Sequence, residues 1–155
     1  MPCLCAVGLT PGLLGNLLGN TEEPPADPKT VAEYRIKAAC LYRFDQFIEW
    51  PASAFSGEKT PLVFGVLGKD PFGEILDQTL KGKTILGRTI TIKRFASVKA
   101  IESCHMLFVS SSETQNLEEV FGAIKAFPAA TVGEADGFLK AGGVFRFFVQ
   151  ENKVQ

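Results

Sequence analysis

The chain has 155 residues, of which 46% are hydrophobic and 21% are charged. This composition provides enough apolar material for one packed core and excludes an intrinsically disordered chain. The formal net charge is -1, so no strong overall field attracts a nucleic-acid backbone or an anionic membrane surface. We therefore expect no nucleic-acid partner and no direct membrane insertion.

The first 29 residues differ in composition from the rest. Residues 1–19 are apolar and small, and no basic residue precedes Lys29. A signal peptide needs basic residues before an unbroken apolar core, so this stretch is not a convincing one. Residues 20–29 carry acidic residues and prolines, which is typical of a solvated linker. We expect residues 1–29 to be a leader remnant or a disordered linker, followed by one folded domain over residues 30–155.

The domain is expected to open with a helix over about residues 30–48. Thr30 and Glu33 have the spacing of a capping box, and apolar residues then recur at steps of three and four. Pro51 disfavours helical geometry at Trp50, so the helix should stop before this corner.

A strand and a second helix are expected next. Residues 61–67 form a short apolar run rich in β-forming residues, which predicts a strand covered on both faces. Asp70 and Pro71 are typical of an N-cap and a first helical turn, and Gly82 is suited to end that helix.

The second half continues the alternation of strands and helices. Strands are expected at residues 89–94, 106–109, 130–132 and 143–149, and a helix is expected at residues 114–126. The pattern predicts a single three-layer α/β domain with a mostly parallel sheet flanked by helices.

The sequence shows no catalytic constellation. His105 is the only histidine, and on a strand its side chain would face away from that of Cys104. The four cysteines, at positions 3, 5, 40 and 104, form neither a disulfide framework nor a metal-binding pattern. We expect no catalytic residue, no metal, no cofactor and no disulfide.

Two loops are candidates for binding a small ligand, because α/β sheets bind ligands beyond the carboxyl ends of their strands. Their residues are Gly68, Lys69, Asp70 and Gly73 in one loop, and Ser110, Ser111 and Ser112 in the other. The alternative is structural, since the same residues are suited to tight turns and helix caps.

The end of the first helix is a candidate surface for binding a partner protein. Phe44, Phe47, Trp50 and Pro51 bring aromatic and apolar side chains together there. The alternative is that these rings belong to the core.

Residues 32–51, AEYRIKAACLYRFDQFIEWP, resemble the opening of the YfiR-like family, in which a Lys-Ala-Ala helix leads into a Trp-Pro corner. Later pieces follow the order and spacing of that family over about residues 31–155. They are LGKDPFG at 67–73, Gly82-Lys83, Gly87-Arg88, CHMLF at 104–108, TVG at 131–133, and Phe138 with Gly142-Gly143.

The resemblance implies a non-enzymatic periplasmic protein that binds a membrane diguanylate cyclase and inhibits it. Such inhibition lowers cyclic di-GMP and disfavours biofilm formation. Some relatives are joined to sensor kinases, so the alternative is a periplasmic domain that senses a small ligand for a sensor kinase or another membrane receptor. A homodimer is compatible with either reading.

The chain departs from the family pattern in three places. Some relatives pair a cysteine in the strand that holds Gly65 with one at the position of Cys104, and here that first cysteine is missing. Arg146 stands where the family has Asn. The family continues with a further strand and a final helix, so we expect this chain to be truncated at its C-terminus.

Overall fold

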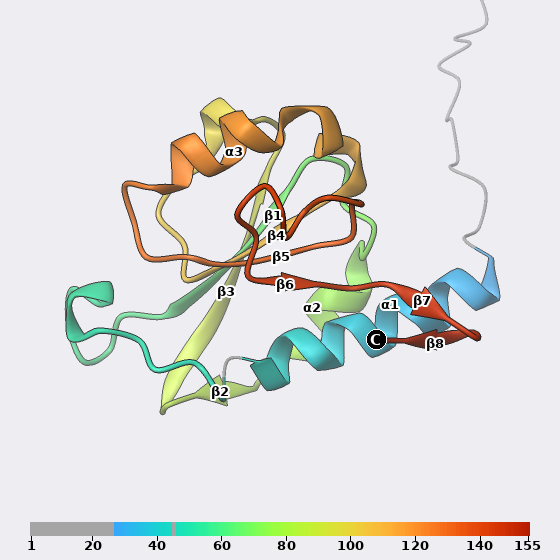
Figure 1. The fold of residues 1–155 in the computed structure, drawn as a ribbon. Coiled ribbons are helices and arrows are strands. Elements are labelled where there is room, and N and C mark those ends of the chain that lie inside the picture. The colour runs from blue at the N-terminus through green and yellow to red at the C-terminus, as the bar shows by residue number, and fades with distance from the viewer. Residues whose placement is uncertain (1–26, 45) are drawn as a thin grey trace, which may run out of the picture.

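A computed structural model describes residues 27–44 and 46–155, so most of the predicted leader or linker lies outside the described residues. The centre of the fold is a six-stranded sheet with the order β2-β3-β1-β4-β5-β6 (Figure 1). All neighbouring strands are parallel except the β2–β3 pair. The strands are β1 (Leu62–Leu67), β2 (Thr84–Ile85), β3 (Arg88–Phe95), β4 (Met106–Val109), β5 (Ala130–Gly133) and β6 (Phe145–Arg146).

Helices cover both faces of the sheet (Figure 1). The helices α1 (Pro28–Phe44) and α2 (Glu74–Leu80) pack on one face, and α3 (Leu117–Ile124) packs on the other. A hairpin of β7 (Val149–Gln150) and β8 (Lys153–Val154) lies beside α1. Three short 3₁₀ helices span Ala52–Ala54, Val98–Ala100 and Ser111–Asn116. The predicted three-layer α/β domain with a mostly parallel sheet is confirmed.

The alternation of side chains along β4 explains why its sequence is apolar throughout. Met106 and Phe108 pack with α1 and α2, whereas Leu107 and Val109 pack with α3. All four are at most 1% exposed. A central strand buried on both faces has no position for a polar side chain.

The first helix begins and ends earlier than the sequence pattern predicts. The amide of Val31 donates to the carbonyl of Asp27 at 3.0 Å, so Thr30 lies within the helix and does not cap it. At the other end, the amide of Phe47 donates to the carbonyl of Phe44, three residues earlier, at 2.9 Å, which closes a tight turn. The helix therefore stops at Phe44, short of the predicted residue 48.

The second helix begins later than predicted. The carboxylate of Asp70 accepts from the amide of Phe72 at 2.8 Å, which forms a local turn. Gly73, with φ at +50°, then precedes the helix. The prediction that Asp70 caps the helix itself is therefore wrong, whereas its end before Gly82 is confirmed.

Differences elsewhere are small. The predicted helix at 114–126 is a 3₁₀ turn that leads into α3, and the predicted strand at 143–149 is divided between β6 and β7. No helix in the described part of the chain is long and apolar enough to cross a membrane.

The ring of Phe138 packs directly on the backbone of Gly133 and Gly143. This packing predicts the effect of a substitution on stability. A Cβ atom on Gly143 would lie 2.9 Å from the carbonyl oxygen of Phe138 and would also overlap the ring of that residue. We expect Gly143→Ala to cost about 1–3 kcal/mol because the backbone cannot yield. Thermal unfolding measures the effect. Gly122→Ala is the control, since its Cβ meets nothing within 4 Å and the residue is helical. A melting temperature for Gly143→Ala at or above that of Gly122→Ala would contradict this packing.

Candidate functional site

The two loops predicted to bind a ligand meet at the carboxyl ends of β1 and β4. The amide of Lys69 donates to Oγ of Ser112 at 3.0 Å. A cavity of about 460 Å³, here called the strand-end pocket, opens between these loops and α1. Its lining consists of Thr30, Tyr34, Lys69, Asp70, Pro71, Ser110, Ser111 and Ser112. The structure thus brings together residues that are about 40 positions apart in the sequence, as α/β topology predicts.

Several polar groups of these loops are bound to other protein groups. Asp70 accepts from Phe72 and also from Nε of Arg94 at 2.6 Å. Oγ of Ser110 accepts from the amide of Ser112 at 3.4 Å and thereby caps the 3₁₀ helix that follows it. Gly73 supplies the positive φ before α2. These bonds account for a structural role of the loops, and ligand binding at them stays a prediction.

Arg94 joins the end of β3 to the start of α2. Its guanidinium donates to Oδ2 of Asp70, to Oδ2 of Asp77 at 2.5 Å and to the carbonyl of Gly73 at 3.0 Å. The hydrogen bonds to Asp77 and Asp70 raise the pKa of Arg94. The sequence analysis did not single out this residue, because its partners lie in a different element.

A partly buried ionic cluster joins α1 to the carboxyl end of β5. Lys37 forms ion pairs with Glu33, one helical turn earlier, and with Glu134, which follows β5. Tyr34 donates its hydroxyl to Oε2 of Glu134 at 3.1 Å. Burial, followed by the negative charge of Glu134, raises the pKa of the Tyr34 phenol. We call these four residues the Lys37 cluster. The side chain of Lys37 is only 4% exposed.

The Lys37 cluster was missed in the sequence analysis, although a signal was present. Lys37 occupies a position next to Ala38 on the apolar face of the first helix, where a basic residue needs a buried partner. Tyr34 belongs both to this cluster and to the lining of the strand-end pocket. The cluster therefore fixes one wall of that pocket.

The four residues at the end of the first helix do not form one continuous surface. The ring of Phe44 stacks on that of Phe145 at 4.8 Å between centroids and packs against the core. Trp50 packs edge-on against the ring of His105 at 5.6 Å. Phe47 is 83% exposed, and Pro51 is exposed as well.

His105 connects the Trp-Pro corner to the sheet. Its Nδ1 accepts from the amide of Val63 at 3.0 Å, which leaves Nε2 to donate to the carbonyl of Ala54 at 3.0 Å. The ring also stacks on Phe55 at 4.5 Å. Burial lowers the pKa of His105, because a charged ring would lose water and could not accept from Val63. The residue therefore has a structural role and stays neutral.

Cys104 lies on the other face of the sheet from His105. It is 2% exposed and its thiol is free, and burial raises its pKa to about 12. A Cβ atom added to Gly65 would lie 3.3 Å from Sγ of Cys104.

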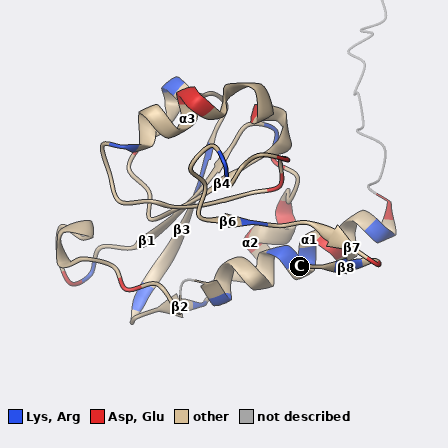
Figure 2. Cartoon of the chain, in the orientation of Figure 1, with Lys and Arg blue, Asp and Glu red and all other residues tan. Residues whose placement is uncertain are grey.

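Among the described residues, no group of three or more His, Cys, Asp or Glu side chains could hold a metal ion. Basic and acidic residues are spread over several elements (Figure 2).

We expect Lys37→Met to destabilise the protein by about 3 kcal/mol, because it leaves the carboxylate of Glu134 buried without its cation. Urea unfolding of the single variant and of Lys37→Met with Glu134→Gln measures the coupling between the two positions. The double variant should recover part of the loss. Arg35→Met on the exposed side of the same helix is the control and should have little effect. Equal losses for Lys37→Met and Arg35→Met would show that the cluster contributes nothing.

The lowered pKa of His105 predicts that the folded protein loses stability in mild acid. Its pKa in the folded state is lowered, so its contribution is complete above the unfolded value of about 6.5 and is lost as the pH falls through the folded value. The free energy of unfolding should therefore decrease from about pH 7 towards pH 5. Because the chain has one histidine, His105→Gln should remove this slope. An unchanged slope in that variant would assign the effect to carboxylates.

The distance between Gly65 and Cys104 predicts that a disulfide can be restored. We expect Gly65→Cys to form a bond with Cys104 on oxidation, once the side chains of Phe95 and Leu107 shift away from the new Cβ. Counting free thiols before and after oxidation, together with peptide mapping, tests the bond. Val66→Cys is the control, since Val66 packs on the opposite face of the sheet. A bond from position 66, or none from position 65, would refute this arrangement.

Comparison with known proteins assigns the chain to a family. A model of the YfiR/HmsC-like family (DUF4154) matches residues 34–155, which include every strand of the sheet and the residues of both candidate surfaces. Among curated proteins, none matches the chain significantly. The matched segment begins at Tyr34 of the Lys37 cluster and includes the Trp-Pro corner that His105 holds. Because the matched segment covers most of the sequence, the chain belongs to the YfiR/HmsC-like family.

Proposed function

We propose that this chain is a non-enzymatic periplasmic regulator that binds a membrane diguanylate cyclase and holds it inactive, which lowers cyclic di-GMP. Membership of the YfiR/HmsC-like family is the observation that carries this proposal. The side-chain contacts are in keeping with it. Lys37 pairs with Glu33 and Glu134, and His105 bonds to the backbone of Val63 and Ala54, so these titratable groups have contacts that fix the fold.

The segment after α1 is the best candidate for the surface that contacts the cyclase. Phe44 and Trp50 are packed against the core on either side of this segment, and Phe47 projects between them. In the sequence, Phe47 lies between the packed residues Phe44 and Trp50, and the exposed Pro51 follows Trp50 directly. Exposed aromatic side chains backed in this way are typical of residues that dominate a protein interface.

A second candidate function is a periplasmic domain that senses a small ligand for a sensor kinase or another membrane receptor. The strand-end pocket supports it, since a cavity of about 460 Å³ lies at the carboxyl ends of parallel strands. A ligand that binds only the folded state would raise the melting temperature. Melting temperatures measured with a panel of small anions and metabolites therefore distinguish the two functions. Ligand sensing requires a rise in melting temperature with at least one compound, whereas cyclase inhibition does not.

Replacing Phe47 tests the proposed interface. With the purified periplasmic domain of a membrane diguanylate cyclase from the same organism, we expect Phe47→Asp to weaken binding by roughly 30-fold, as for a residue that dominates an interface. Its melting temperature should not change, because the ring is 83% exposed. Leu86→Asp is the matched control, since Leu86 is 69% exposed and its φ of +52° favours Asp over Leu. Equal affinities for both variants and the wild type would exclude this surface.

A further inference from the structure

We propose that His105 is a pH-sensitive switch for residues 50–55, here called the corner segment: in mild acid, protonation of its ring releases this segment and weakens partner binding at the surface beside it. The corner segment contains Trp50, Pro51, the 3₁₀ helix Ala52–Ala54 and Phe55. Its release is a property of the chain alone, whereas the effect on the partner rests on the proposed function.

The ring of His105 takes the place of a backbone partner at the start of β1. Val63 uses both of its backbone groups on this one residue. Its carbonyl accepts from the His105 amide at 2.9 Å, and its amide donates to Nδ1 of the ring at 3.0 Å. The paired residues of β1 and β4 begin only at Phe64 and Met106. The amide of Val63 therefore depends on an acceptor nitrogen, which only the unprotonated ring has.

The other ring nitrogen holds the corner segment. Because Nδ1 is the acceptor, Nε2 carries the proton and donates to the carbonyl of Ala54 at 3.0 Å. The amide of Ala54 in turn donates to the carbonyl of Pro51 at 2.8 Å. Trp50 packs edge-on against the ring, and Phe55 stacks on it. His105 thus joins β1 to the segment that carries Pro51 of the candidate partner surface.

Protonation of the ring breaks the attachment to β1. A proton on Nδ1 would point at the amide proton of Val63, so two donors would face each other. The interior is closely packed, so the ring relieves this conflict by moving away from β1 together with the side chains stacked on it. The corner segment then loses its connection to the sheet.

Arg88 limits how far the release extends. Its guanidinium, at the start of β3, donates to the carbonyl of Gly57 at 2.8 Å and to that of Thr60 at 2.9 Å. It also lies 3.9 Å from the centroid of the Phe55 ring. An arginine keeps its charge over the whole range in which histidine titrates, so these bonds persist in acid. The released part therefore ends at Phe55.

The charged groups around the ring offer no partner to a cationic His105. Burial is the largest cause of its lowered pKa; its bond to a backbone carbonyl raises the pKa, and the positive charge of Arg88 lowers it. The neighbouring strands β1, β4 and β5 contain no charged residue. Glu49, Glu58 and Lys59 flank the corner segment and are exposed. In the described part of the chain, no carboxylate bonds to the ring.

Trp50 reports the release, because it is the only tryptophan of the chain. As the pH falls from 7 to 5, its emission maximum should shift to longer wavelength while the far-ultraviolet circular dichroism stays constant. His105→Gln supplies an acceptor and a donor that do not titrate in this range, so it should show no shift. A constant emission maximum in the wild type, or an equal shift in the variant, would overturn the switch.

Amide exchange in the wild type separates local release from global unfolding. The amide of Val63 should lose roughly tenfold of its protection between pH 7 and pH 5, because the released ring titrates near 6.5. It should also be less protected than the amide of Gly68, which donates to the carbonyl of Phe95 at the other end of β1. Equal protection of these two amides would mean that only global unfolding exposes Val63, which would overturn the inference.

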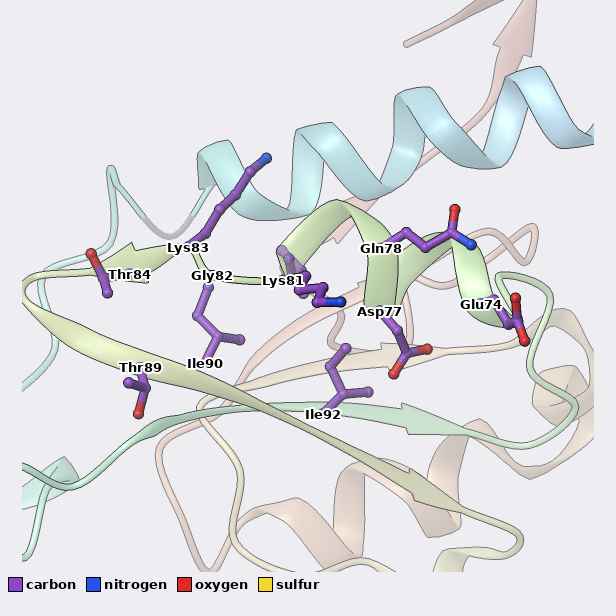
Figure 3. Close-up of a pocket in the computed structure, with 11 residues that line it drawn as sticks. Glu74, Asp77, Gln78, Lys81, Gly82, Lys83, Thr84, Thr89, Ile90 and Ile92 are labelled. Atoms are coloured by element: carbon purple, nitrogen blue, oxygen red, sulfur yellow. The ribbon is translucent and has the colours of Figure 1, made fainter.

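The turn after α2 provides a control for exchange at the surface. The amide of Lys83 donates to the carbonyl of Leu80 at 3.0 Å, beside a cavity of about 740 Å³ between α2 and β3 (Figure 3). His105 does not line this cavity. The protection of the Lys83 amide should therefore be the same at pH 7 and pH 5. A loss there as large as at Val63 would show a general effect of acid and would count against a switch at His105.

Partner binding is measured separately, with the periplasmic domain of a membrane diguanylate cyclase from the same organism. The wild type should bind about tenfold more weakly at pH 5 than at pH 7, and His105→Gln should change by less than about twofold. Equal weakening of both proteins would overturn the coupling between the switch and the partner. An absence of binding at pH 7 would instead contradict the proposed function, and the fluorescence and exchange results would still decide whether the segment is released.

Discussion

Burial of the central strands on both faces is the constraint on which the rest of this structure depends. The side chains of β4 are divided between the two helical layers, and β1 is treated in the same way, with Phe64 and Val66 on one side and Leu67 on the other. A sheet of this kind is stable only when both helical layers are held against it. Polar contacts at the ends of the strands help to hold these helical layers against the sheet. The Lys37 cluster holds α1 to the end of β5, and Arg94 holds α2 to the end of β3.

This arrangement gives the strand-end residues two candidate roles that the sequence could not separate. Asp70 and Ser110 lie where α/β proteins commonly bind ligands, yet both also bond to neighbouring backbone amides. Asp70 turns the chain ahead of α2, and Ser110 caps the 3₁₀ helix that follows it. The Trp-Pro corner shows the same principle, because Trp50 and Phe44 are held by the core and leave Phe47 exposed. In the proposed regulator, the rigid core thus presents a short aromatic segment to its partner.

The sequence was sufficient to predict the elements whose signal is local. The runs at 61–67 and 106–109 are apolar, and β1 and β4 lie within them. Features set by distant contacts were not predictable. The first helix stops at Phe44, whose ring stacks on Phe145 about a hundred residues later. Asp70 and Arg94 meet only because β1 and β3 are adjacent and parallel. The hairpin of β7 and β8 was missed because strands of two residues carry no periodic signal.

Cellular cyclic di-GMP is the quantity that tests the central claim most directly. It should be measured in a bacterial host that carries the gene of a membrane diguanylate cyclase from the same organism, with and without this protein exported to the periplasm. The account predicts a clear fall in cyclic di-GMP when the folded protein is exported, and no fall in a host whose cyclase lacks its periplasmic domain. An unchanged level in the presence of exported, folded protein would contradict the proposed inhibition of the cyclase.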